Sequence, residues 1–228
     1  MNKEAFKADD DWSYSGDTGP EHWSEIAPLC ATGRQQSPID LEEFIPGDLP
    51  PLHFHYDVRA LCLANNGHAV QVHFEPGGAI EVGDHRFDLD HLHFHAPAEH
   101  RIQGKGYELE AHFVHKDEAN ATAVVALLYE DGAFNRAFAK IDRLLPANKG
   151  ETHELAIRLT AAEFLPDKRD YYYYDGSLTT PPATEGIGWY ILKTPLTIET
   201  SEVQGVLRAD DGPNNRPLQA RNGRKVLA

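Results

Sequence analysis

Hydrophobic and polar residues alternate along short stretches of this chain, and turn-forming residues separate each stretch from the next. Such stretches lie at 52–56, 68–75, 79–83, 91–95, 107–115, 122–130 and 188–193. Alternation with a period of two is typical of strands with one buried face, and turn signals at this spacing predict mainly antiparallel neighbours. Residues 122–130 are almost continuously apolar, which predicts a central strand covered on both faces.

Helical spacing is clear in one place, between residues 134 and 145, and a proline follows it. The apolar residues that recur there are Phe134, Ala137, Phe138, Ile141, Leu144 and Leu145. This spacing predicts a helix that the proline ends. Capping boxes at 160–163 and 201–204 predict two further short helices. With no internal repeat or linker, the pattern predicts one β-dominated α+β domain over residues 1–228, with residues 1–11 as a flexible N-terminal segment.

Composition narrows the class of protein. The chain has 228 residues, 25% of them charged, and a formal net charge of −15. A nucleic-acid-binding protein needs a basic face, so this charge argues against that class. No apolar run reaches the roughly 18–20 residues that span a bilayer, which argues against membrane insertion. The N-terminus has no apolar signal core, so we expect a cytoplasmic protein or the mature form of an exported one.

Candidate chemistry appears in the segment LDHLHFHAPAEH, residues 89–100. His91, His93 and His95 alternate with apolar neighbours, so a strand directs all three imidazoles to one face. They could simply be polar residues on the solvated face of an edge strand. A second segment, YELEAHFVHKD, makes a metal site the better interpretation, because a hairpin between the two strands could bring His112 opposite His93 or His95.

Three imidazoles that leave a fourth position open are typical of a catalytic zinc site, whereas structural zinc sites are closed by four ligands. No cysteine lies near the cluster, which fits an open site. Glu110 shares a face with His112 and is placed to orient a ligand. His115 has the opposite parity and is expected in the core, and we keep His100 apart from the ligand set. The other histidines are expected at the surface or in local hydrogen bonds.

A third segment, GSLTTPPATEGIGW at 176–189, decides between these interpretations. Together with HFHAPAEH, NNGHA, ELEAHFVH, QQSPID and NNRPLQ, it resembles the α-class carbonic anhydrases, particularly their bacterial branch. The resemblance covers essentially the whole chain. It implies a mostly antiparallel, twisted central sheet of about ten strands with short peripheral helices. It also implies reversible hydration of CO2 to bicarbonate and a proton through zinc-bound hydroxide, and inhibition by sulfonamides and anions.

The resemblance assigns the zinc ligands to His93, His95 and His112, so His91 is not a ligand. His91 stands where the family often has a glutamine that accepts from the first ligand, a role open to a neutral imidazole. Glu110 matches the carboxylate that supports His112 in the family. His100 is likewise expected among the residues that surround the ligands without binding the metal.

The resemblance also assigns residues to the reaction itself. Thr179 matches the residue that accepts the hydrogen of the zinc-bound hydroxide, and Glu99 matches the carboxylate that accepts from Thr179. In this family the zinc-bound water has a pKa of about 7, a figure that belongs to the family. His68 matches the proton shuttle, a task suited to the ordinary pKa of histidine. Its expected water-ordering neighbours are Tyr14, Asn66 and Gln71.

An apolar wall for CO2 is expected beside the metal. The residues that match this wall are Val114, Val124, Leu178, Ile187 and Trp189, and Thr180 is expected to line the substrate side. Each of the five wall residues could instead serve core packing alone.

The two cysteines depart from the bacterial pattern, because Ala183 stands where those relatives often have a bridging cysteine. Cys30 and Cys62 could therefore pair with each other, stay free, or form an intermolecular disulfide in a homodimer. Bacterial relatives of this kind are typically periplasmic or secreted, which is our expectation here. Two other functions remain open: a binding module with weak catalysis, and a zinc esterase. The complete set of expected ligands argues against the first, and the small apolar pocket argues against the second as the main activity.

Overall fold

The computed structural model describes residues 12–228, and most of their regular structure is a single large curled sheet. The segment 1–11 that we expected to be flexible lies outside the described residues. In chain order the strands are β1 (Asp40–Leu41), β2 (Phe44–Ile45), β3 (Leu52–His55), β4 (Ala60–Asn65), β5 (Val70–Phe74), β6 (Ala79–Val82), β7 (His85–His95), β8 (Arg101–Ile102), β9 (Leu109–Lys116), β10 (Thr122–Asp131), β11 (Thr152–Glu154), β12 (Tyr171–Ser177), β13 (Glu185–Leu192), β14 (Leu196–Ile198) and β15 (Val226–Leu227).

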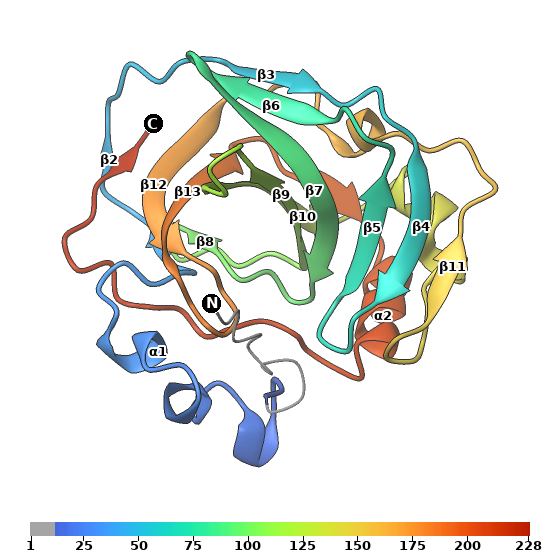
Figure 1. The fold of residues 1–228 in the computed structure, drawn as a ribbon, viewed down its shortest axis with the longest axis horizontal. Helices are drawn as coiled ribbons and strands as arrows, with labels where there is room; N and C mark the ends of the chain where they lie inside the picture. The colour runs from blue at the N-terminus through green and yellow to red at the C-terminus, as the bar shows by residue number, and fades with distance from the viewer. Residues whose placement is uncertain (1–11) are drawn as a thin grey trace, which may run out of the picture.

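Thirteen of the strands among the described residues form this sheet, in the order β11-β4-β5-β7-β9-β10-β13-β12-β15-β2, with β3, β6 and β14 attached beside that path. Figure 1 shows β7, β9 and β10 at its centre, between β4 and β5 on one side and β12 and β13 on the other. Most pairings are antiparallel, while β10 pairs in parallel with β13 and β14, and β15 with β2. The predicted β-dominated fold is therefore confirmed.

Strand β10 shows why the centre of the sheet is so apolar. Along it, Val124 belongs to one buried cluster and Val125 to another, because successive side chains point to opposite faces. Both faces of β10 are therefore covered, as its unbroken apolar sequence predicts. The cluster that contains Val124 also contains Val114, Ile187 and Trp189, and it packs behind the site described below.

Helices are few and short, and they lie outside the sheet. They are η1 (Gly16–Thr18), η2 (Trp23–Glu25), α1 (Leu29–Thr32), η3 (Phe138–Lys140), η4 (Asp142–Leu144), η5 (Ala161–Phe164) and α2 (Thr200–Ala209), where η marks a 3-10 helix. The capping box of Thr160 with Glu163 is present at η5. The helix α2 also exists, but its capping box joins Glu199 to Glu202, two residues earlier than the predicted box at 201–204. No helix among the described residues is long and apolar enough to cross a membrane.

The predicted helix over 134–145 is wrong. The structure has only the 3-10 turns η3 and η4 there, and the side chain of Asn135 caps the backbone N–H groups of Ala137 and Phe138. The apolar positions at its two ends, Phe134 and Leu144, remain exposed, so no continuous apolar face is available to pack a regular helix.

The two cysteines are both half-buried and are not bonded to each other. Cys62 lies on β4, opposite Glu154 of β11, whereas Cys30 lies in the helix α1. An internal disulfide, one of the three possibilities left open by the sequence, is therefore absent from the structure.

His115 lies on the face of β9 opposite to His112, in the core, as its parity predicts. Its Nε2 lies 2.6 Å from the hydroxyl of Tyr56, and its Nδ1 lies 3.3 Å from the carbonyl oxygen of Ala123. Burial lowers the pKa of His115 to about 3, although the backbone of Ala123 and Phe113 opposes the shift. The folded protein therefore holds this imidazole neutral.

We expect His115 to make the protein sensitive to acid. Below pH 6.5 His115 becomes protonated in the unfolded chain but stays neutral in the folded protein. The free energy of unfolding therefore falls between about pH 6.5 and pH 3. The full loss is on the order of 5 kcal/mol. Denaturant unfolding at several pH values should show a shallower acid slope for His115→Gln than for wild type. The exposed-site variant His53→Gln should keep the wild-type slope, and equal slopes for all three proteins would contradict the assignment.

Candidate functional site

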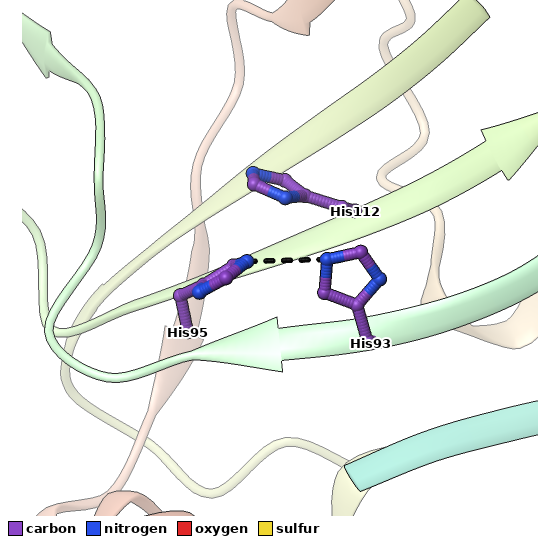
Figure 2. A group of neighbouring side chains, drawn as sticks. All are labelled: His93, His95 and His112. Carbon is purple, nitrogen blue, oxygen red and sulfur yellow. Dashed lines mark hydrogen bonds between the residues drawn. The ribbon is translucent and has the colours of Figure 1, made fainter. Parts of the chain in front are cut away.

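Three histidines from the neighbouring strands β7 and β9 converge near the C-terminal end of β7. His93 and His95 alternate on β7, and the antiparallel register of β7 with β9 places His112 directly opposite His93. Figure 2 shows the three rings facing one another. The predicted hairpin contact between the two histidine-bearing segments is therefore present.

Each ring of the β7 pair is fixed by a hydrogen bond at its Nδ1. The Nδ1 of His93 lies 3.1 Å from Nε2 of His91, and Nδ1 of His91 lies 3.0 Å from the Asp90 carboxylate. The Nδ1 of His95 lies 2.7 Å from the backbone oxygen of Asn214. If each Nδ1 donates along these contacts, the lone pairs of His93 and His95 are left at Nε2.

His112 is held the other way round, through Nε2. That atom lies 2.8 Å from Oε1 of Glu110, which leaves Nδ1 of His112 for a ligand. Glu110 is completely buried and also accepts from Nδ1 of His100 and from the backbone N–H groups of Glu99 and His100. Burial alone raises the pKa of Glu110, but His100 and His112 outweigh it and hold the pKa well below its usual range. Glu110 is therefore an anionic anchor for His112.

His100 continues this network away from the three histidines. Its Nε2 lies 2.6 Å from the Tyr174 hydroxyl, which in turn lies 2.7 Å from Oγ of Ser37. His100, Glu110 and His112 also lie close enough together to hold a cation. Nδ1 of His100 and Nε2 of His112 are already hydrogen-bonded to Glu110. We therefore interpret these three residues as a support for His112 and not as a second metal site.

The trio of His93, His95 and His112 fits a tetrahedral metal ion. Their candidate ligand atoms lie within 4.8 Å of one another, and the two Nε2 atoms are 3.1 Å apart. Zinc–nitrogen bonds of 2.0–2.1 Å would place two tetrahedral ligands about 3.3 Å apart. Burial, as the largest cause, lowers the pKa of all three imidazoles. Neutral imidazoles are the form that binds a metal.

Thr179 and Glu99 lie buried beside this trio. Oε1 of Glu99 accepts the backbone N–H of Arg216 at 2.8 Å, and Oε2 has no hydrogen-bond partner at ordinary distance among residues 12–228. Burial raises the pKa of Glu99 to about 7, while His112, Arg216 and the Thr179 hydroxyl act in the opposite direction. A cation at the histidines would further favour the ionised carboxylate.

The site opens into a cleft of about 340 Å³. Ten of the residues predicted for the site line it, namely Tyr14, Asn66, His68, Gln71, His91, His93, His95, Val114, Leu178 and Thr180. Of the five expected wall residues, Val114 and Leu178 reach the cleft. The other three lie in the buried cluster that packs with them and are not among the lining residues: Val124, Ile187 and Trp189. The structure therefore gives these three a supporting position behind the wall.

His68 lies at the rim of the cleft, on the turn between β4 and β5. Oδ1 of Asn66 accepts the backbone N–H of His68 at 2.8 Å, so the Asn66 side chain builds the turn that presents the imidazole. The ring of His68 stacks on Trp12, with centroids 3.7 Å apart and planes 6° from parallel. Gln71 follows on β5, where it pairs with His93.

Several contributors to the site were not singled out from the sequence. Trp12, Asp90 and Lys116 line the cleft, while Asn214 and Arg216 orient His95 and Glu99 from below. The segment NNRPLQ carries Asn214 and Arg216, and the resemblance alone had marked it. The two contacts that orient His95 and Glu99 use backbone atoms of Asn214 and Arg216, which leave no residue-type signal in a sequence.

Comparisons with known proteins agree with this geometry. A family model described as eukaryotic-type carbonic anhydrase matches residues 18–228. The carbonic anhydrase of Neisseria gonorrhoeae is 38% identical over 220 residues, covering 95% of this chain and 87% of that protein. The α-carbonic anhydrase structure from Photobacterium profundum superposes with a TM-score of 0.92 at 38% identity, covering 95% of this chain and 100% of that one.

The α-carbonic anhydrase of Thermovibrio ammonificans, solved in complex with sulfanilamide, has a TM-score of 0.91 and is 38% identical, covering 95% of this chain and 98% of that one. The match of family model, sequence and fold extends over nearly the whole chain. This chain therefore belongs to the α-class carbonic anhydrases, the enzymes that interconvert carbon dioxide and bicarbonate.

Proposed function

We propose that this enzyme hydrates CO2 with one Zn2+ ion held by His93, His95 and His112. The observation that carries the proposal is the convergence of three ring nitrogens whose opposite nitrogens are each hydrogen-bonded. Such bonds to the far nitrogen fix ring orientation and increase ligand basicity. A three-histidine donor set leaves a fourth position open, as in catalytic zinc sites.

Zinc supplies an activated water when it is bound, with a pKa of about 7 in carbonic anhydrases themselves. The chain's own residues then direct the attacking oxygen. The hydroxyl of Thr179 is placed to donate a hydrogen bond to the buried Glu99 carboxylate, whose pKa it lowers, so this hydroxyl can only accept from the attacking oxygen. The hydrogen of that oxygen is held away from the carbon, and a lone pair is left facing it.

The cleft wall selects the substrate. CO2 is apolar and has few groups to hydrogen-bond, so a small apolar surface beside the metal suits it. Val114 and Leu178 supply this surface, and Thr180 stands on the substrate side. We also propose binding of sulfonamides and anions at the open position, because the similar Thermovibrio enzyme binds sulfanilamide. Hydrolysis of activated esters would be a weak side reaction.

Stopped-flow CO2 hydration tests the proposal most directly. The zinc-loaded protein should turn over rapidly, and turnover should rise with buffer concentration because proton export limits the rate. The protein treated with a chelator should be inactive and should recover when one Zn2+ per chain is returned. An inactive protein that holds one Zn2+ would instead favour a binding module.

We further propose that His68 exports the proton. It lies at the rim of the cleft, and histidine is the side chain generally suited to exchange protons near neutral pH. Tyr14 and Gln71 line the same cleft as His68, His93 and His95, where they are placed to order water. Asn66 contributes by building the turn.

Replacing His68 by alanine is expected to lower turnover by about tenfold at low buffer, less than the roughly 100-fold or more of a general acid or base in a chemical step, because buffer can still carry part of the proton. The rate constant kcat/KM should stay near wild type, because interconversion of CO2 and bicarbonate does not use this group. Added imidazole should restore kcat. The matched variant His73→Ala removes a half-buried histidine on β5 that does not line the cleft, and it should behave as wild type. Unchanged low-buffer turnover in His68→Ala would rule out the shuttle.

A further inference from the structure

Asp210 is half-buried, and its carboxyl group lies near the backbone of Val70, which directly follows the turn that carries His68. Asp210 ends the helix α2 as its C-cap residue, and its backbone N–H bonds the carbonyl of Val206. Oδ2 of Asp210 accepts a hydrogen bond of 2.9 Å from the side-chain amide of Asn214. Oδ1 is buried and has no hydrogen-bond partner within residues 12–228. A carboxyl oxygen that is buried without a hydrogen bond destabilises the folded protein.

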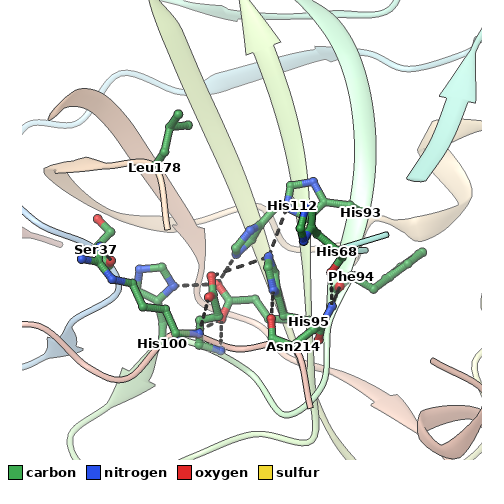
Figure 3. Close-up of polar contacts among 12 residues, drawn as sticks. Ser37, His68, His93, Phe94, His95, His100, His112, Leu178 and Asn214 are labelled. Atoms are coloured by element: carbon green, nitrogen blue, oxygen red, sulfur yellow. Dashed lines mark hydrogen bonds and ion pairs between the residues drawn. The ribbon is translucent and has the colours of Figure 1, made fainter. Parts of the chain in front are cut away.

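Asn214 connects this carboxyl to the working part of the site. Its backbone oxygen accepts from Nδ1 of His95, and its side-chain Nδ2 donates to the carbonyl of Phe94 at 2.9 Å. The same Nδ2 lies 3.5 Å from the backbone carbonyl of His68. Figure 3 shows Asn214 between the β7 residues and His68. The side-chain amide of Asn214 therefore contacts Asp210, strand β7 and the turn that carries His68.

A second observation places Asp210 within electrostatic reach of the cleft. Tyr14 lines the cleft, and its hydroxyl is buried with no hydrogen-bond partner among the described residues. Burial raises the pKa of Tyr14 well above its usual value, and Glu99 and then Asp210 add to the shift. Tyr14 also packs edge-on against Trp12, the ring on which His68 stacks. The Asp210 carboxyl group thus influences Tyr14 electrostatically and also contacts Asn214.

We propose that Asp210 is a positioning residue for proton transfer, which fixes the turn bearing His68 by holding the side-chain amide of Asn214. The inference rests on the proposed shuttle role of His68. Asp210 does not touch the reacting atoms. Its oxygen sets the position of Nδ2 of Asn214, and that nitrogen borders the His68 carbonyl.

The environment of Asp210 favours its neutral form. Burial raises the pKa of Asp210 to about 8, and the backbone of Val70 on β5 opposes the shift. The facing groups are polar or acidic: the Asn214 amide from the loop after α2, and Tyr14 from the N-terminal segment, which Glu99 also influences. Because the folded pKa lies above the unfolded value, Asp210 costs stability increasingly as pH rises from about 4 to 8. Replacing it by asparagine should remove this cost.

The test uses zinc-loaded Asp210→Ala, Asp210→Asn and the control Asp211→Asn. Asp211 is the adjacent acid, is exposed, and has a positive φ that asparagine tolerates. Asp210→Ala should lower kcat at low buffer by about fivefold, the cost of one ordinary hydrogen bond, with kcat/KM within twofold of wild type. Asp210→Asn keeps an acceptor for Asn214 and should retain kcat, as should Asp211→Asn.

Two measurements separate positioning from general damage to the fold. The double variant Asp210→Ala/His68→Ala should be no slower at low buffer than His68→Ala alone, because the carboxyl acts through that imidazole. The NMR signals of the His68 ring should shift in Asp210→Ala and not in Asp211→Asn, in zinc-free protein as well. The midpoint of thermal unfolding should rise in Asp210→Asn relative to wild type, by more at pH 8.5 than at pH 5.

Each contrary result has a defined meaning. If kcat and kcat/KM fall together in Asp210→Ala, or if its effect persists undiminished without His68, the positioning role is wrong. If His68→Ala slows turnover and Asp210→Ala does not, the inference alone fails. If His68→Ala leaves turnover at low buffer unchanged, His68 is not the proton shuttle. The proposed role of Asp210 is then wrong as well.

Discussion

Replacing His95 by alanine is expected to lower CO2 hydration by well over about 100-fold, which exceeds the usual cost of losing a group that merely orients a ligand. His95 is 1% exposed, and its ring is fixed between Asn214 and the convergence point with His93. Without its Nε2, two imidazoles remain, too few for a tight zinc site of this kind. Activity should disappear because the metal is lost.

The zinc content of the purified variant, measured by atomic emission, should fall together with its stopped-flow rate. The matched variant His73→Ala removes an imidazole from the neighbouring strand β5 and should keep one Zn2+ per chain. Circular dichroism would verify that both variants fold. Full zinc occupancy and a normal rate in His95→Ala would exclude this histidine as a ligand.

Thr179→Val is expected to reduce kcat/KM for CO2 by about 100-fold while leaving zinc bound, comparable to the loss of one preorganised catalytic hydrogen bond. The side chain of Thr179 is buried next to Glu99, and its hydroxyl lowers the pKa of that carboxyl. Valine keeps the shape of threonine and removes the hydroxyl. The attacking oxygen then loses the acceptor that fixes its hydrogen, and the Glu99 carboxylate loses a donor.

Thr179→Ser retains the hydroxyl and should remain within a few-fold of wild type. Stopped-flow rates at high buffer measure the chemical step without the limit set by proton export. A loss of zinc in Thr179→Val would show that the hydroxyl serves the metal site instead. Equal rates for the valine and serine variants would show that the hydroxyl is dispensable.

The histidine cluster illustrates how far local pattern reaches. Alternation along 91–95 predicts that His91, His93 and His95 share one face, and they do, because β7 is regular through them. Alternation alone cannot say which two of these three histidines join His112 in the metal site. The register of β7 with β9 decides it, by placing His112 opposite His93. That register is a property of two paired strands, which the sequence pattern left open; the resemblance to a known family supplied only the choice of ligands.

The outcome at 134–145 shows where local pattern fails. Apolar residues recur there at helical spacing, yet Asn135 caps the turn, Phe134 stays exposed, and only 3-10 turns form. Helical periodicity predicts a helix only when a neighbouring surface covers the apolar face. The strands carried a stronger signal, since β10 is apolar along nearly its whole length and is buried on both faces.

By itself, the amino-acid sequence determined the β-dominated class, the central position of β10 and the shared face of the alternating histidines, because these follow from the period of side chains along one strand. Tertiary structure alone decided the contacts that join distant segments. Asn214 reaches His95 across 119 residues through a backbone oxygen, and Arg216 reaches Glu99 across 117 through a backbone N–H. Every residue type offers these backbone groups, so no local pattern can mark them.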